Sequence, residues 1–184
     1  MSLLHLRAAA RALRAGGVAA YPTEGVWGLG CDPLNQGAVT RLLALKRRDW
    51  RKGLILIGAS FDQLRPFVEL PSKTAQKRAF ATWPGPTTWV FPASEDAPMW
   101  LSGERDTLAI RVTAHPVARA LCEAFGGALV STSANREGRP PARSATEVRR
   151  LFGSGVDALV PGALGGLAGP TAIRDVISGL ILRR

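Results

Sequence analysis

Hydroxyl, amide and carboxylate side chains stand where apolar runs of the sequence end. Thr23 and Glu24 follow the apolar residues 18–21, and the tripeptide Ser133-Ala134-Asn135 follows residues 128–132. In open α/β sheets, ligands bind at the ends of strands, on loops that a rigid sheet holds in place. Together with several Arg and Lys, the hydroxyls and the amide form a set that binds and orients anions and stabilises charge rather than supplying a nucleophile. The pattern leaves open a plain turn with a solvated Thr-Glu tip.

Positively charged residues form the second candidate feature. Arg111 lies inside the apolar residues 108–112, and an unpaired buried charge is costly, so it contacts either a structural carboxylate or the carboxylate of a ligand. Residues 41–52 contain six Lys or Arg, and residues 136–150 contain five Arg. These segments either flank one electropositive groove for a triphosphate or an RNA backbone, or are solvated helix ends.

Composition limits the classes of protein. The 184 residues are 46% hydrophobic and 21% charged, which is typical of one globular domain. A net charge of +10 favours anionic partners. Two cysteines fit a reducing compartment, and no apolar run reaches the roughly 20 residues of a membrane span, so we expect a cytoplasmic protein without membrane attachment. The phosphate-binding G-x-x-x-x-G-K-[ST] motif is missing from the sequence.

The elements that must position these residues alternate along the chain. Capping residues and apolar periodicity predict helices over residues 3–15, 36–46, 60–63, 72–83, 116–125 and 144–152. Apolar or β-branched runs predict strands over residues 18–21, 54–57, 87–91, 107–112, 128–132, 157–160, 171–177 and 180–182. Residues 97–104 are expected to be a loop. This alternation predicts an α/β fold, a single domain over residues 1–184 with a mixed sheet and flanking helices.

Several motifs together carry a resemblance to a known family. Residues 21–30 (YPTEGVWGLG) resemble the P-T-E-T-x-Y-G-L signature of the YrdC/TsaC family, and residues 46–48 its K-x-R motif. Residues 83–88 are similar to its W-P-G-P-x-T segment, residues 109–112 to its A-x-R-x strand, and residues 133–135 to its S-x-N motif. The matches follow the family order along the whole chain, and the length is similar to the short bacterial TsaC (RimN-like) form.

The resemblance implies a threonylcarbamoyl-AMP synthase, a nucleotidyltransferase. It would form threonylcarbamoyl-adenylate and pyrophosphate from L-threonine, bicarbonate and ATP. Mg²⁺ would come with ATP, and the product would pass to the threonylcarbamoyl-transfer machinery that modifies tRNA. The implied fold is a twisted open sheet around a basic concave groove. The alternative is an RNA-binding module that takes structured RNA and assists ribosomal RNA maturation.

The resemblance also implies roles for individual residues. Those expected to hold L-threonine are Thr23, Arg111, Ser133 and Thr171. Those expected to hold ATP are Lys46, Arg48, Thr107, Asn135, Arg143 and Arg183. Lys46, Arg48, Ser133 and Asn135 would be the catalytic set, and Glu24 would brace its loop rather than act as a base. The chain departs from the family pattern at Asp49, after K-x-R, and at Glu137, after S-x-N.

Overall fold

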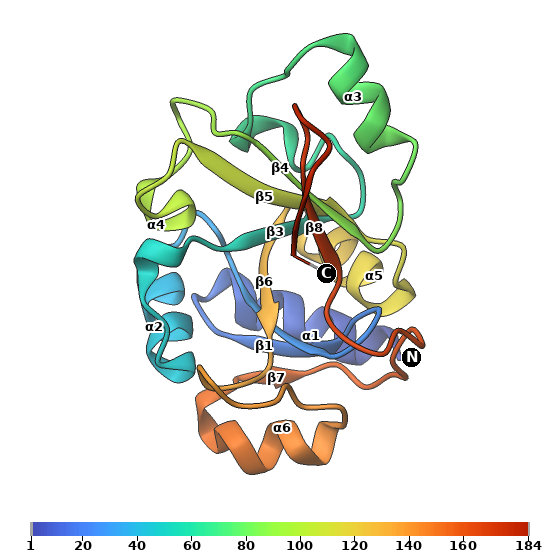
Figure 1. The fold of residues 1–184 in the computed structure, drawn as a ribbon. Helices are drawn as coiled ribbons and strands as arrows, with labels where there is room; N and C mark the ends of the chain where they lie inside the picture. The colour runs from blue at the N-terminus through green and yellow to red at the C-terminus, as the bar shows by residue number, and fades with distance from the viewer. Residues whose placement is uncertain (1, 184) are drawn as a thin grey trace.

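One continuous mixed sheet with helices around it forms the molecule (Figure 1). The structure is a computed structural model and describes residues 2–183. The α-helices in these residues are α1 (Leu3–Arg14), α2 (Gln36–Lys46), α3 (Lys73–Phe80), α4 (Met99–Ser102), α5 (Pro116–Phe125) and α6 (Ala145–Phe152). The strands are β1 (Ala19–Pro22), β2 (Trp27–Cys31), β3 (Ile55–Gly58), β4 (Thr87–Pro92), β5 (Thr107–Val112), β6 (Leu129–Ser133), β7 (Ala158–Leu159), β8 (Ala172–Asp175) and β9 (Ile181–Arg183). Short 3₁₀ turns cover η1 (Trp50–Lys52), η2 (Arg65–Phe67) and η3 (Gly153–Gly155).

The strands lie in the order β7-β1-β2-β6-β3-β5-β4-β8-β9. The pairs β1–β7, β3–β5 and β4–β8 are parallel, and the remaining neighbours are antiparallel. The mixed α/β sheet expected from the sequence is therefore confirmed. Because β6 lies between β2 and β3, the strand that ends in Ser133 occupies the middle of the sheet, beside the strand that begins at Trp27.

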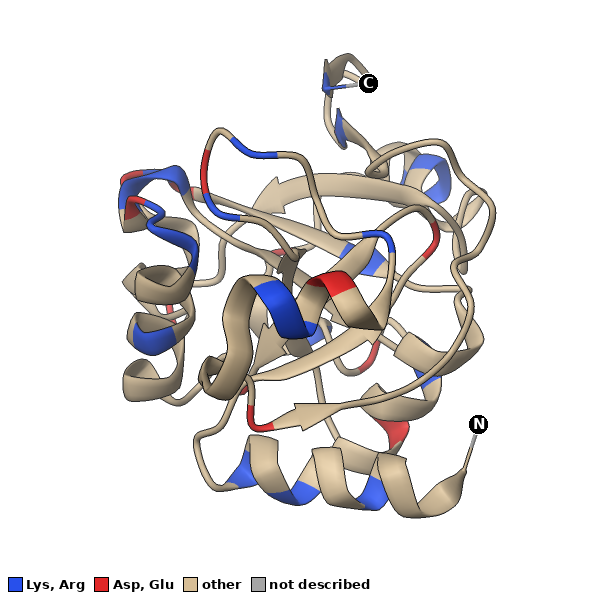
Figure 2. Ribbon diagram, turned by 90° about the horizontal axis from the view of Figure 1, so that it is seen from below, with Lys and Arg blue, Asp and Glu red and all other residues tan. Residues whose placement is uncertain are grey.

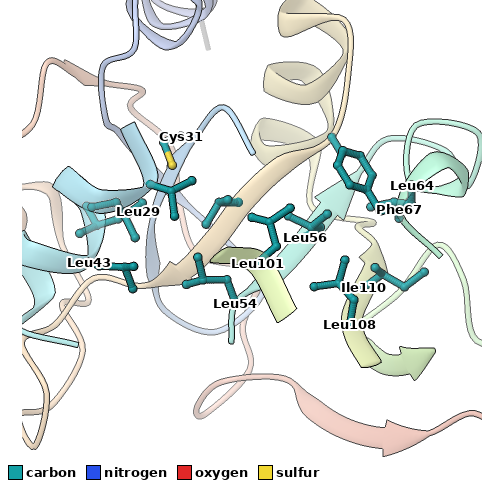
Figure 3. Close-up of a cluster of buried hydrophobic side chains, with 14 of the residues drawn as sticks. Leu29, Cys31, Leu43, Leu54, Leu56, Leu64, Phe67, Leu101, Leu108 and Ile110 are labelled. Carbon is teal, nitrogen blue, oxygen red and sulfur yellow. The ribbon is translucent and has the colours of Figure 1, made fainter. Parts of the chain in front are cut away.

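The central strands of the sheet are buried on both faces, which explains their continuous apolar runs. Ile57 of β3 packs with α1 and α5, whereas its neighbour Leu56 lies in the larger cluster on the opposite face. Figure 3 shows part of this larger cluster, to which Leu29, Leu56 and Leu108 contribute from three different strands. Fully burying one such side chain stabilises the fold by about 1.5–3 kcal/mol. The strands therefore form a rigid support for the loops at their ends.

Helix starts follow the caps that the sequence indicates. Oδ1 of Asn35 accepts from the amide of Ala38 at 3.0 Å, and Oγ of Ser144 accepts from the amide of Glu147 at 3.2 Å. Each bond satisfies a backbone donor that the first helical turn leaves without a partner. None of the helices in residues 2–183 is long and apolar enough to cross a membrane.

Three local expectations are wrong. Residues 60–63 form a bend and a turn instead of a helix, because the Gln63 amide oxygen accepts from the backbone of Ala59, at 2.8 Å, rather than from a helix start. Residues 97–104 contain the short helix α4, which buries Leu101 completely but is too short to show a periodic pattern. The helix expected over residues 72–83 ends at Phe80.

Candidate functional site

A small polar cavity opens where the ends of four sheet segments meet. Its volume is about 100 Å³, and its polar walls come from the β1–β2 turn, β5, β6 and the segment before β8. The polar residues that line it are Thr23, Arg48, Arg111, Ser131, Thr132, Ser133, Thr171 and Arg183. The four residues expected to share one ligand, Thr23, Arg111, Ser133 and Thr171, are thus brought together. We call this space the amino-acid cavity, after the ligand that the sequence resemblance implies for these four residues.

Strand register explains this convergence. The β2–β6 pairing places Gly28 opposite Ser133, so the start of one strand meets the end of the other. In the tight turn before β2, both the amide and the hydroxyl of Thr23 donate to the carbonyl of Val26, at 3.1 and 2.7 Å. With its proton committed, the Thr23 hydroxyl has only acceptor capacity left for a ligand.

Arg111 forms the structural ion pair that is one of the two alternatives left open by its place in an apolar strand. Its Nη2 lies 3.2 Å from Oε2 of Glu24, and both side chains are less than 10% exposed. Its Nη1 donates to Oγ1 of Thr171 at 2.8 Å. The guanidinium is therefore in a structural ion pair and at the same time lines the amino-acid cavity.

The ammonium of Lys46 is buried against the S-x-N loop. It donates to the carbonyl of Ser133, and to the carbonyl and Oδ1 of Asn135 at 2.9 and 3.2 Å. Burial, together with the charge of Arg48, lowers the pKa of Lys46 to about 8. Lys46 thus fixes the loop that carries Ser133 and Asn135, and neither Lys46 nor Asn135 lines the amino-acid cavity.

Arg48 lines both the amino-acid cavity and a second cavity. Arg47 has a left-handed φ of 53°, which ends α2 and turns the chain so that Arg48 reaches the sheet. Arg48 donates to the carbonyl of Gly53 at 2.9 Å, and burial lowers its pKa. Its Nε is buried without a partner among the described residues. A buried donor in this state favours an anionic ligand.

The second cavity, of about 350 Å³, has an apolar floor and a cationic rim. It shares Arg48, Leu54, Ile55 and Arg183 with the amino-acid cavity, so the two are adjacent. Its polar lining residues are Arg48, Lys52, Ser102, Arg105, Thr107 and Arg183. All the charged residues that line it are cations. We call this space the cationic cavity.

The remaining expected site residues lie in different places. Thr107 lines the cationic cavity, and Arg183 lines both cavities. Burial and the charges of Arg48 and Arg111 lower the pKa of Arg183, as expected where cations gather without an anion. Arg143 lines neither cavity: it is exposed, and its Nη1 donates to the carbonyl of Ala168 at 2.9 Å.

The two departures from the family pattern have structural partners. The Glu137 carboxylate forms an ion pair with Lys52, and its amide donates to the carbonyl of Lys46 at 2.9 Å. Asp49 caps η1 by accepting from the amide of Arg51 at 3.1 Å. Glu137 therefore links the S-x-N loop to the segment after α2 at the rim of the site.

Residues 161–171, which we call the strap, cross over the β1–β2 turn. The amide of Gly165 donates to the carbonyl of Thr23 at 3.0 Å, and that of Leu167 to the carbonyl of Glu24 at 2.9 Å. A Cβ added to Gly25 would lie 1.8 Å from the carbonyl oxygen of Gly169, so only glycine permits this approach. The end of the strap, Pro170 and Thr171, forms a wall of the amino-acid cavity.

Sequence reasoning missed the residues behind Arg111. Thr88 lies 3.1 Å from Thr171 (Oγ1–Oγ1), Thr113 donates to Glu24 at 2.7 Å, and the His115 ring contacts the strap at the carbonyl of Ala163, at 3.0 Å. All three side chains are buried. The only available signal was polar residues in and after strongly apolar strands, as for Arg111.

A family model and two named proteins match this chain over most of its length. Residues 11–184 match the model of the Sua5/YciO/YrdC family, described as telomere recombination. A protein of Halorhodospira halophila named threonylcarbamoyl-AMP synthase is 66% identical over 97% of this chain and 94% of its own length. A protein of Coxiella burnetii with the same name is 53% identical over 95% of this chain and 94% of its own.

Two solved structures are similar to this chain over most of its length. The structure of P. abyssi Sua5 with L-threonine has a TM-score of 0.87 at 35% identity, covering 92% of this chain and 50% of that one. E. coli YciO has a TM-score of 0.85 at 25% identity, covering 97% and 88%. The chain thus spans about half the length of the Sua5 chains and nearly all of the curated relatives.

Proposed function

The chain belongs to the Sua5/YciO/YrdC family, and from this premise we propose that it is a threonylcarbamoyl-AMP synthase. The observation that supports the proposal is that the two cavities are adjacent and share lining residues. A small cavity lined by hydroxyls and three arginines lies beside a larger cavity with a cationic rim. An amino acid and a nucleotide triphosphate could therefore lie end to end, with their reacting groups at the junction.

In the amino-acid cavity, each polar group suits one part of L-threonine. The Arg111 guanidinium would take the carboxylate, because a planar charged donor fits that group best. The Thr23 hydroxyl, left with acceptor capacity only, would take an N–H of the amine. Ser133 and Thr171 would orient the remainder of the substrate, and a fixed amine would be held close to bicarbonate.

In the cationic cavity, ATP would lie with its phosphates on the arginines. The amine of threonine and bicarbonate give a carbamate and water. A carbamate oxygen then attacks the α-phosphorus in line, and pyrophosphate leaves. Arg48 and Arg183 lie at the junction of the cavities, where they would neutralise the charge that develops on the phosphates. Asn135 would act from the S-x-N loop, which Lys46 at the end of α2 holds in place. Thr107 would contribute at the wall of the cationic cavity, and Arg143 from outside the two cavities.

Mg²⁺ enters the proposal bound to the triphosphate. The residues that line the two cavities include hydroxyls and cations but no carboxylate, and Mg²⁺ in nucleotide sites is often held largely by phosphates and water. The product, a mixed anhydride, would serve threonylcarbamoyl transfer to tRNA in the cytoplasm. The RNA-binding alternative gains no support from the named relatives.

Pyrophosphate release tests the proposal. We expect release from ATP only when L-threonine and bicarbonate are both present, and a much higher threonine requirement in Arg111→Ala. As a control, Arg119→Ala removes an exposed arginine of α5 that pairs only with Glu123 in the described residues, and it should behave like the wild type. ATP consumption that does not depend on threonine would contradict the proposed function.

A further inference from the structure

A chain of buried polar groups lies behind the amino-acid cavity, and the reaction described above does not use it. Its centre is Glu24, which is 6% exposed and does not line either cavity. Oε2 of Glu24 lies 3.2 Å from Nη2 of Arg111, the residue proposed to bind the substrate carboxylate. The ion pair joins the β1–β2 turn to β5 across 87 residues of sequence.

The second carboxylate oxygen of Glu24 also has a hydrogen-bond partner. Oε1 accepts from the hydroxyl of Thr113 at 2.7 Å, and this hydroxyl in turn accepts from the amide of His115 at 3.1 Å. Thr113 is fully buried, and its amide donates to the carbonyl of Gly58 at 3.1 Å. The carboxylate is thus held from both sides by groups that the sheet fixes, so it is a rigid support for the arginine.

Arg111 is held equally firmly on its other side. Nη1 donates to Oγ1 of Thr171 at 2.8 Å and lies 3.4 Å from Oγ1 of Thr88. Fixed partners on both terminal nitrogens define the plane of the guanidinium. Without Glu24 the arginine would keep only its hydroxyl partners, and a long flexible side chain would regain rotational freedom.

Glu24 also helps to hold the strap in place. The backbone carbonyl of Glu24 accepts from Leu167, and its side chain orients the arginine that binds Thr171. Glu24 therefore contacts the strap through its backbone and supports the end of the strap through Arg111.

We propose that Glu24 is a positioning residue for the amino-acid substrate, which acts by fixing the orientation of Arg111. The inference rests on the proposed function. A buried pair of this kind is weak evidence for stability but can provide a single geometry. Binding of a carboxylate by a planar guanidinium depends on that geometry, and a misplacement near 1 Å can cost roughly 10²-fold in rate.

Three variants test the role of Glu24. In Glu24→Ala we expect the KM for threonine to rise at least about tenfold, while the KM for ATP at saturating threonine changes less than about twofold. In Glu24→Gln the amide oxygen can still accept from Arg111 and the amide nitrogen can donate to Thr113, so most of the threonine affinity should return. Glu123→Gln alters an exposed pair with Arg119 on α5 and should match the wild type.

Specific results would overturn the inference. An unchanged threonine KM in Glu24→Ala would show that Arg111 needs no support, and an equal rise in both KM values would show that Glu24 acts on the fold as a whole. If Glu24→Ala does not fold, Thr113→Val decides: loss of one hydroxyl should raise the threonine KM severalfold, and no change would refute the role. A wild type without threonine-dependent pyrophosphate release would instead refute the proposed function itself, and with it this inference.

Discussion

Replacing Gly25 by alanine should separate the strap from the β1–β2 turn. The new Cβ would lie 1.8 Å from the carbonyl oxygen of Gly169 and 3.2 Å from Cβ of Leu167. An ordinary contact needs about 3.5 Å, so the strap must move by roughly 1.7 Å. Overpacking of this kind typically costs about 1–3 kcal/mol, which lowers the Tm of a chain of this length by about 2–12 °C.

The effect on substrate should exceed the effect on stability. Because Thr171 ends the strap and lines the amino-acid cavity, a displaced strap alters a wall of the site. We expect kcat/KM for threonine to fall about 10²-fold, measured by pyrophosphate release at saturating ATP. Gly127→Ala, whose nearest neighbour would lie at 3.6 Å, is the matched control. Normal threonine kinetics and an unchanged Tm in Gly25→Ala would show that the strap does not hold the cavity in shape.

Three further predictions concern charge and packing. Since burial lowers the pKa of Lys46 to about 8, ATP affinity measured by calorimetry should weaken as the pH rises through 8, where the ligand-free protein loses this cation. Lys46→Met should bind ATP more weakly and without this pH dependence; a wild-type affinity that is constant from pH 7 to 9.5 would contradict the argument. Arg183→Ala should raise the KM for ATP about tenfold, a loss near 1.4 kcal/mol, whereas Arg174→Ala on the neighbouring strand should not; equal effects would remove Arg183 from the site. Leu56→Ala should lower the free energy of unfolding in urea by about 2–5 kcal/mol, and a loss below about 1 kcal/mol would mean that the core collapses around the gap.

The same protonation of Lys46 links pH to stability. The unfolded chain keeps this lysine protonated up to its ordinary pKa of 10.5, whereas the folded protein loses the proton near pH 8. Between these values the unfolded state binds more protons, so the contribution of Lys46 to the free energy of unfolding rises with pH. Below pH 8 the folded protein bears the cost of a buried charge, which bound phosphate would offset.

Helices and strands were predicted well where a few neighbouring residues carry the signal for them. The strand over residues 107–112 and the helix that begins at Pro116 were predicted with their observed starts. Asn35 caps a helix because a cap needs only one side-chain oxygen that accepts a hydrogen bond from the backbone amide three residues later. The helix α4 has no such periodic signal: its four residues are held by burial of Leu101.

The site was predictable as a set of residues but not as an arrangement. Strand-end hydroxyls indicated that Thr23 and Ser133 belong to a ligand site, and the register of β2 and β6 brings them together. The partners of Arg111 and Lys46 lie 87 residues away, at Glu24 and at the S-x-N loop. No local pattern encodes such contacts, because they depend on which strands become neighbours in the sheet.

The central place of β6 in the sheet has a consequence for synthesis. β2 and β3 do not pair with each other, since both pair with β6, which the ribosome makes about seventy residues after β3. Until that segment emerges, the nascent chain exposes the edges of two apolar strands, a state that is prone to aggregate. β7 then joins β1 from an even greater sequence distance. The topology therefore predicts that the sheet closes slowly and late in folding. Until the second half of the chain has been made, the first half would need chaperones to protect it from aggregation.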